Sequence, residues 1–148
     1  MTALASWKSE TRAVLKEYAY ACDDTQVFVD QIIRNETISG HITGLPAEAY
    51  DKFKMVFYVK TNHWYVHPFE GDTEGSSFAN LNVNGEFKIK TVLRQVASKR
   101  LAAVLVPRSY KVVSQRWFLK PFLGIFGGIL KYECAHKLVD GNGDFFTN

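Results

Sequence analysis

The sequence has few cysteines, and they lack the spacings that bind metal or carry redox chemistry. Its two cysteines, Cys22 and Cys134, form neither a pair of zinc ligands nor a C-x-x-C motif. One potential bridge is also not the dense disulfide framework on which small secreted domains depend. We therefore expect both cysteines to be free thiols, and we expect no metal and no cofactor.

The sequence also lacks long apolar runs, which argues against a secretory signal peptide and against a transmembrane helix. The N-terminus, MTALASWKSE, has no run of about seven apolar residues behind a basic flank, so we do not expect a secretory signal peptide. The apolar stretch from Phe118 to Leu130 contains Lys120, Pro121 and three glycines, and it is shorter than the roughly 20 residues that span a bilayer. We expect a cytoplasmic protein unless a leader precedes this sequence.

Recognisable catalytic motifs are missing as well. There is no G-x-S-x-G elbow, and GIFGGILK at 124–131 departs from the phosphate-binding loop in its glycine spacing and in lacking Ser or Thr after Lys131. DGNGDF at 140–145 begins like a calcium loop but has Phe145 where glycine is required, so we interpret it as a hairpin turn. We expect a protein that is not an enzyme.

The residues that are present fit one globular domain with two charged halves. The 148 residues are 47% hydrophobic and 22% charged, enough for one sizeable core. Through Gly85 the chain has seven Lys and Arg against eleven Asp and Glu, a net of −4; from Glu86 onward it has eleven against four, a net of +7. This asymmetry fits either one globule with two charged faces, or an acidic face on one copy that meets a basic face on the next.

Apolar residues recur at spacings of three and four near the N-terminus, and this predicts an amphipathic helix within residues 1–24. The stripe consists of Leu4, Trp7, Val14, Leu15, Tyr18 and Cys22, with Thr11 as its one weak member. We expect the stripe to dock on its own domain. The alternative is that it packs on a neighbouring copy, because a terminal helix is easily exchanged.

Residues 25–114 show the pattern of short strands divided by turns, and we predict a β-sandwich body over this range. The predicted strands are 25–33, 36–45, 53–61 and 100–110, with Gly40 and Gly44 marking a bulge or sharp bends. The run at 53–61 is almost continuously apolar, which is typical of a central strand buried on both faces.

The segment 81–89 gives the clearest local signal for a hairpin. Apolar residues alternate with polar ones around Asn84-Gly85, a pair favoured in two-residue type I′ turns. Since no helices separate the strands, we predict a mainly β fold, an antiparallel immunoglobulin-like sandwich preceded by the helix. We expect the segment 115–148 to pack on this body or on a neighbour.

Three stretches resemble a group of small bacterial β-sandwich modules. They are FYVKTNHWYVHPF at 57–69, FANLNVNGEFKI at 78–89 and LAAVLVPRSY at 101–110. The pattern of the modules is YVKT-x-x-WY-x-x-P, then a polar-Gly-aromatic hairpin, then A-A-L/V-L-V ending near a tyrosine. Such modules are immunoglobulin-like in appearance and are sometimes attached to enzymes that act on polysaccharides. The resemblance covers roughly residues 40–110 and implies no catalytic residue.

Aromatic residues and histidines are concentrated just after the predicted central strand. If strand geometry continues, His63, Tyr65 and His67 share one face and Trp64 lies on the other, where we expect it in the core. The alternative for Trp64 is an exposed platform that stacks on a sugar or a base. The better candidates for a ligand platform are Tyr65, His67 and Trp117.

The spacing of these histidines also suggests a metal site. His63 and His67 could share a metal with Glu70 or Asp72 in the loop that follows. Four residues along a strand cover about 13 Å, which is too far for both rings to reach one ion. We therefore predict no metal here.

The apolar stretch 118–130 and the basic residues around it are the main candidates for contact with other molecules. We expect this stretch to be buried in the core or between subunits, with a position on a membrane surface as the alternative. Basic residues interleaved with aromatics would also suit nucleic acid, but no recognised motif accompanies them, so nucleic acid is disfavoured. The candidate interaction residues are Trp7, Tyr18, Lys88, Lys90, Arg116, Phe118, Phe122 and Phe126.

The function predicted from these features is protein–protein interaction or self-assembly as a homo-oligomer. The charge asymmetry, the terminal helix and the apolar stretch would all be explained by it. Carbohydrate binding is the alternative, and association with a membrane surface is the third hypothesis.

Overall fold

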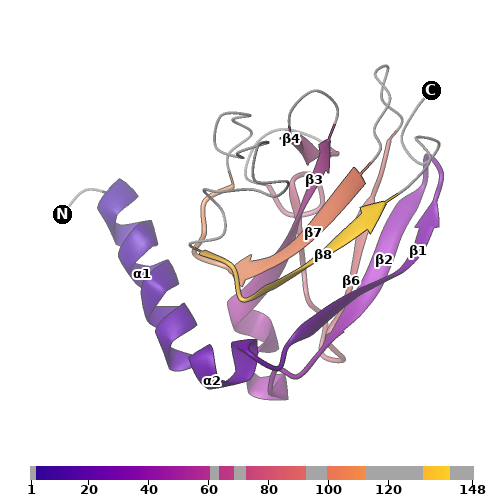
Figure 1. The fold of residues 1–148 in the computed structure, drawn as a ribbon. Helices are drawn as coiled ribbons and strands as arrows, with labels where there is room; N and C mark the ends of the chain where they lie inside the picture. Colours follow the sequence, from indigo (N-terminus) through magenta and orange to yellow (C-terminus); the bar gives the residue numbers. More distant parts are fainter. Residues whose placement is uncertain (1–2, 61–63, 69–72, 93–99, 113–131, 141–148) are drawn as a thin grey trace.

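A computed structural model describes residues 3–60, 64–68, 73–92, 100–112 and 132–140, with side chains from Trp7 onward. This part of the chain contains an N-terminal helical segment, one 3₁₀ helix and eight strands (Figure 1). Their bounds are α1 Ala3–Glu17, α2 Ala19–Cys22, β1 Gln26–Ile33, β2 Thr37–Thr43, η1 Ala47–Lys52, β3 Phe53–Lys60, β4 Trp64–His67, β5 Phe78–Asn80, β6 Glu86–Lys90, β7 Arg100–Pro107 and β8 Ala135–Asp140.

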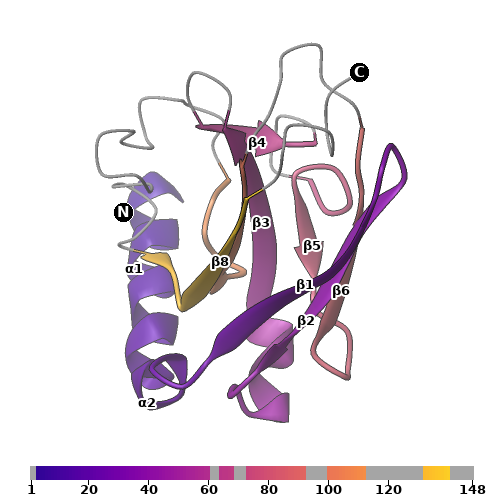
Figure 2. The same ribbon diagram turned by 45° about the vertical axis from the view of Figure 1, so that its right-hand side comes forward.

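The strands form two antiparallel sheets, as Figures 1 and 2 show. One sheet has the order β1-β2-β6, and the other has the order β4-β3-β7-β8, with β5 also paired to β3. The prediction of a mainly β, antiparallel fold with an N-terminal helix is confirmed. Strand β8 comes from the predicted C-terminal segment and pairs with β7, so the β-rich body does not end at residue 114.

Strand β3 is buried on both faces, and apart from Lys54 its buried residues are apolar. Phe53, Met55 and Phe57 point into a core shared with the three-stranded sheet, which contributes residues such as Ile38 and Phe87. Alternate residues of β3 belong to a second cluster on the opposite face, together with parts of β4, β7 and the segments near 110 and 132. The prediction of a central strand buried on both faces is confirmed.

The N-terminal helix docks on its own domain. The ring centroid of Trp7 lies 5.5 Å from that of Tyr110 and 5.4 Å from that of Tyr132. At the other end of the helix, the Tyr18 ring meets Phe53 at 5.8 Å. Both predicted interaction residues of the helix therefore make contacts inside the domain.

Thr11, the weak member of the apolar stripe, is fully buried on this helix. Its hydroxyl lies 2.8 Å from the Ser109 hydroxyl, so the two side chains satisfy each other. A buried hydroxyl needs such a partner, since an unpaired one costs about 1–3 kcal/mol.

Cys22 and Cys134 form a disulfide, so the prediction of free thiols is wrong. Their Cα atoms lie 5.0 Å apart, although they are separated by 112 positions in sequence. The bridge joins the end of α2 to the start of β8, where the Cys134 amide also donates to the Leu105 carbonyl at 2.8 Å. Sequence spacing could not reveal this pair, because the fold alone brings the two positions together.

The turn at Asn84-Gly85 exists, but it is not the predicted two-residue type I′ turn. The Gly85 amide donates to the Asn82 carbonyl at 3.0 Å, and the Asn82 amide donates to the Glu86 carbonyl at 2.9 Å. The loop therefore has three residues, with Gly85 at a φ of 75° as its left-handed position. The paired part of this hairpin is short, because the chain leaves one sheet at β5 and enters the other at β6.

Gly40 and Gly44 mark irregular backbone, as predicted. The register of β1 against β2 shifts between Val29 and Gln31, which places the bulge in β1 opposite Gly40. A Cβ on Gly40 would lie 1.9 Å from the Phe28 carbonyl oxygen, so no side chain fits. Gly44 makes the bend after β2 with a φ of 92°.

We expect loss of the Cys22–Cys134 bridge to lower the free energy of unfolding by about 2–5 kcal/mol, because the bridge closes a long loop in the unfolded chain. Urea unfolding followed by tryptophan fluorescence, with and without dithiothreitol, measures the effect. The C22S/C134S variant should match the reduced protein and show no response to dithiothreitol. A wild-type midpoint that is insensitive to reduction would contradict the bridge.

His136 in β8 gives the fold a pH dependence of known sign. Its Nδ1 lies 2.7 Å from Glu133 Oε2, and this hydrogen bond raises the pKa of His136 above its ordinary value of 6.5. A raised pKa in the folded state stabilises the fold fully below pH 6.5, and this stabilisation is lost as the pH rises through the folded pKa. The E133Q variant should lose this part of the pH dependence in urea titrations; an unchanged profile would show that the pair has no effect.

Candidate functional site

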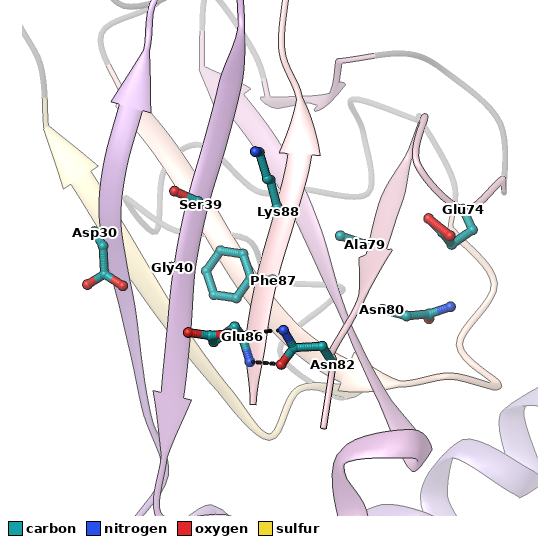
Figure 3. Close-up of a pocket in the computed structure, with 10 residues that line it drawn as sticks. All are labelled: Asp30, Ser39, Gly40, Glu74, Ala79, Asn80, Asn82, Glu86, Phe87 and Lys88. Atoms are coloured by element: carbon teal, nitrogen blue, oxygen red, sulfur yellow. Dashed lines mark hydrogen bonds between the residues drawn. The ribbon is translucent and has the colours of Figure 1, made fainter. Parts of the chain in front are cut away.

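A groove of about 500 Å³ lies beside β6 and extends toward β5 (Figure 3). Its walls come from both sheets, because β6 belongs to the three-stranded sheet and β5 to the other. The lining residues are Asp30, Ser39, Gly40, Glu74, Ala79, Asn80, Asn82, Glu86, Phe87 and Lys88.

The alternation of β6 sets the character of one wall. Glu86 and Lys88 are exposed, whereas Phe87 between them is buried in the core shared by the two sheets. The neighbouring strand has no side chain at Gly40, where a Cβ would lie 2.6 Å from the Phe87 ring. The groove therefore has a polar rim above a tightly packed floor.

Asn82 fixes the end of the groove where the chain turns. Its Oδ1 accepts hydrogen bonds from the Asn84 amide at 2.9 Å and from the Glu86 amide at 3.0 Å. Its Nδ2 donates to Glu86 Oε1 at 3.0 Å, as the dashed lines in Figure 3 indicate. These bonds hold the start of β6 in place. On the β5 side, Asn80 Oδ1 is buried and accepts no hydrogen bond within the described part of the chain.

The edge of β6 that faces away from β2 has no paired strand among the described residues. The Gly85 carbonyl accepts from Ile42, and the Thr91 amide donates to Glu36, so the odd-numbered positions point toward β2. In an antiparallel pair the main-chain groups alternate in direction. The amide and carbonyl of Lys88 therefore point away from β2.

The facing edge of β5 has a similar arrangement. The Phe78 carbonyl accepts from the Gly75 amide at 2.7 Å, which shows that Phe78 directs its main chain away from β3. Asn80 has the same parity and directs its main chain the same way. Within the described residues no ladder joins β5 to β6, so the groove lies between two strand edges.

The described lining residues of the groove carry an excess of negative charge. Asp30, Glu74 and Glu86 supply three carboxylates against the one ammonium of Lys88. Asp30 Oδ2 lies 2.6 Å from His41 Nδ1, which fixes its position at the rim. The His41 ring in turn stacks on Phe28, with centroids 4.8 Å apart and planes 9° from parallel.

Of the three residues predicted as a ligand platform, the structure describes Tyr65 and His67. Trp64 is fully buried, which confirms its place in the core. His67 is also fully buried, with Nε2 2.5 Å from Thr91 Oγ1, so its ring cannot stack on a ligand from solvent. Tyr65 is half-buried on β4. Trp117 lies outside the described residues.

The predicted interaction residues are placed as follows. Lys88 lines the groove and Lys90 lies exposed further along β6. Four others lie outside the described residues: Arg116, Phe118, Phe122 and Phe126. The same holds for His63, Glu70 and Asp72 of the rejected metal set, and no three His, Cys, Asp or Glu side chains of the described residues could hold a metal ion.

Sequence reasoning missed Asp30, Glu74, Asn80, Asn82 and Glu86 as site residues. The alternation of Glu86 and Lys88 with apolar residues was visible, but it only indicates a solvent-facing strand. The groove arises because β5 and β6 separate into different sheets, and no local pattern encodes that separation.

Comparison with protein families, with curated proteins and with solved structures finds no match for this chain. Within the described residues, none of the helices combines the length and apolar character needed to cross a bilayer.

We expect N82A to lower the free energy of unfolding by about 0.5–1.5 kcal/mol, because the turn loses the three hydrogen bonds that the exposed Asn82 side chain makes. N84A is the matched control, and it should change stability by less than about 0.5 kcal/mol, as is usual for exposed positions. Urea titration of both variants measures the difference. Equal effects would show that the Asn82 bonds do not hold the turn.

Proposed function

We propose that this protein is a non-catalytic binding module that contacts other proteins through the groove beside β6. The observation that carries the proposal is the pair of strand edges that face the groove, Lys88 on one side and Asn80 on the other. Main-chain amides and carbonyls at an edge are ready hydrogen-bonding partners for another polypeptide. The exposed charges along the rim add selectivity.

The lining of the groove favours protein over carbohydrate. Sugar-binding sites commonly use an exposed aromatic face for stacking. Among the described residues that line this groove, the one aromatic is Phe87, and it is only 3% exposed. Carbohydrate binding is the second candidate, and it is favoured by Phe28, which is 37% exposed and lies beside the Asp30–His41 pair.

Self-association is the form of protein binding that the charges support. Among its described lining residues the groove has three carboxylates and one ammonium, and the sequence from Glu86 onward, which includes two of these residues, carries a net charge of +7. We propose that basic residues of this half on a second copy meet the acidic groove. The third hypothesis, contact with a membrane surface, depends on 118–130, which lies outside the described residues.

We also propose an oxidising compartment in place of the expected cytoplasm. Disulfides persist in oxidising environments and are rare in cytosolic proteins, where thiols are kept reduced. The Cys22–Cys134 bridge is the supporting observation. The two packed antiparallel sheets support an immunoglobulin-like sandwich as the finer description of the fold, in line with the module resemblance.

We expect light scattering at about 20 mM salt to give a mass above the 16.8 kDa of one chain. At about 1 M salt the mass should fall, because the Debye length shrinks to about 3 Å and screens the opposed charges. E74K reverses an exposed charge of the groove and should reduce the low-salt mass. D23K makes the same change at the end of α2 and serves as the matched control.

A monomer at both salt concentrations would contradict self-association. In that case a glycan array with the F28A variant as control would test the carbohydrate candidate. Equal loss of mass in E74K and D23K would show that net charge matters and that the groove does not.

A further inference from the structure

We infer that a second, smaller pocket anchors the partner protein by taking up one of its basic side chains. This pocket has a volume of about 270 Å³, and its walls come from η1 and from residues 81–83. The lining residues are Ala47, Glu48, Tyr50, Asp51, Leu81, Asn82 and Val83. Asn82 also lines the groove beside β6, so one partner can contact both. The inference rests on the proposed protein-binding function and specifies a side chain through which the partner is held.

The geometry of η1 brings two carboxylates to one wall of the pocket. In a 3₁₀ helix, side chains three positions apart eclipse each other. Glu48 and Asp51 are both exposed and therefore project from the same face, about 6 Å apart along the helix axis. Two like charges at this spacing repel each other, so a cation placed beside both is stabilised.

The protein does not neutralise this acidic wall with a described residue. Neither Glu48 nor Asp51 has an ion-pair partner within the described part of the chain. The neighbouring Lys52 lies on a different face of η1, where it eclipses the buried Ala49. Its ammonium lies 3.6 Å from Glu17 Oε2, which is not a lining residue. The cation that fits must come from another molecule.

The rest of the lining suits the stem of a long basic side chain. Leu81 is buried, Tyr50 is half-buried, and Val83 is 86% exposed. A lysine or arginine lays its methylene stem along such apolar surface while its charged head reaches the carboxylates. Arginine fits this lining best, because its guanidinium is more weakly hydrated than an ammonium and stacks on aromatic rings.

Both walls of the pocket are held in place before a partner arrives. The Ala49 amide donates to the Pro46 carbonyl at 2.9 Å, and the Arg108 amide donates to the Lys52 carbonyl at the same distance. The Tyr50 ring packs against Gly85, where a Cβ would lie 2.9 Å from Tyr50 Cζ. A preformed pocket of this kind loses little conformational freedom when it binds.

Size and charge exclude other occupants. Small-molecule sites usually span about 300–1,000 Å³, so this pocket suits a single side chain. An anionic group would be repelled by the two carboxylates, and an apolar side chain would remove water from them without offering a partner. No three His, Cys, Asp or Glu side chains of the described residues could hold a metal ion.

The probe for the test is Nα-acetyl-arginine amide, and its uncharged counterpart Nα-acetyl-citrulline amide is the control. Binding to the disulfide-bonded protein is followed by NMR through the methyl signals of Leu81 and Val83. We expect saturable shifts at millimolar concentrations of the arginine probe, as is usual for so small a ligand. The citrulline probe should bind about tenfold more weakly, because it cannot pair with the carboxylates.

Three single variants and one double variant locate the binding. E48Q and D51N should each weaken binding of the arginine probe about twofold to fivefold, as expected for partly exposed ion pairs. The double variant E48Q/D51N should bind the arginine probe no better than the citrulline probe. E36Q removes an exposed carboxylate from the turn between β1 and β2 and should leave binding unchanged as the matched control. The same spectra show whether each variant is folded.

The outcomes distinguish this inference from the function on which it rests. Equal shifts with the arginine and citrulline probes, or equal weakening in E36Q and E48Q, would overturn the pocket and leave protein binding through the groove in place. Arginine-specific shifts that E48Q/D51N abolishes, in a protein that stays a monomer at both salt concentrations, would support the pocket and contradict self-association. In that case the basic side chain belongs to a different protein.

Discussion

The burial of β3 on both faces is the constraint on which the rest of the structure depends. A strand with Phe53, Met55 and Phe57 on one face and Val56 and Tyr58 on the other must be covered twice. The three-stranded sheet covers the first face. The second face needs a cover from elsewhere in the chain, and part of it comes from the N-terminal helix through Trp7 and from Tyr110 and Tyr132.

The groove is a consequence of this two-sheet arrangement. The chain passes from β5, which pairs with β3, into β6, which pairs with β2, within the few residues from Leu81 to Gly85. Leu81 and Phe87 are both buried in the core between the sheets, while β5 and β6 separate because each pairs with a strand of a different sheet. The polar residues between them, held by Asn82, then face a space that neither sheet fills. A surface that suits binding thus follows from how the core is closed.

Much of the fold could be predicted from the sequence, because its signals are local. The helical stripe, the continuous apolar run at 53–60 and the bend at Gly44 each depend on neighbours a few residues away, and the structure confirms them. The features that were not predicted depend on residues far apart in the sequence. The bridge from Cys22 to Cys134, the assignment of β5 and β6 to different sheets, and the burial of His67 against Thr91 all result from tertiary packing. The groove also results from tertiary packing. The alternation of residues along the sequence therefore identified Lys88 but not the other residues that line the groove.

The disulfide also decides how mechanical load would travel through the molecule. A pull applied from the chain on either side passes through the helix to Cys22, crosses the sulfur–sulfur bond and leaves along β8. Strands β1 to β7 lie between the two cysteines in sequence, so a covalent shortcut shields them from tension. Among the described elements, α1, α2 and β8 would bear the tension, whereas the strands that line the groove would keep their arrangement while the ends of the molecule are stretched.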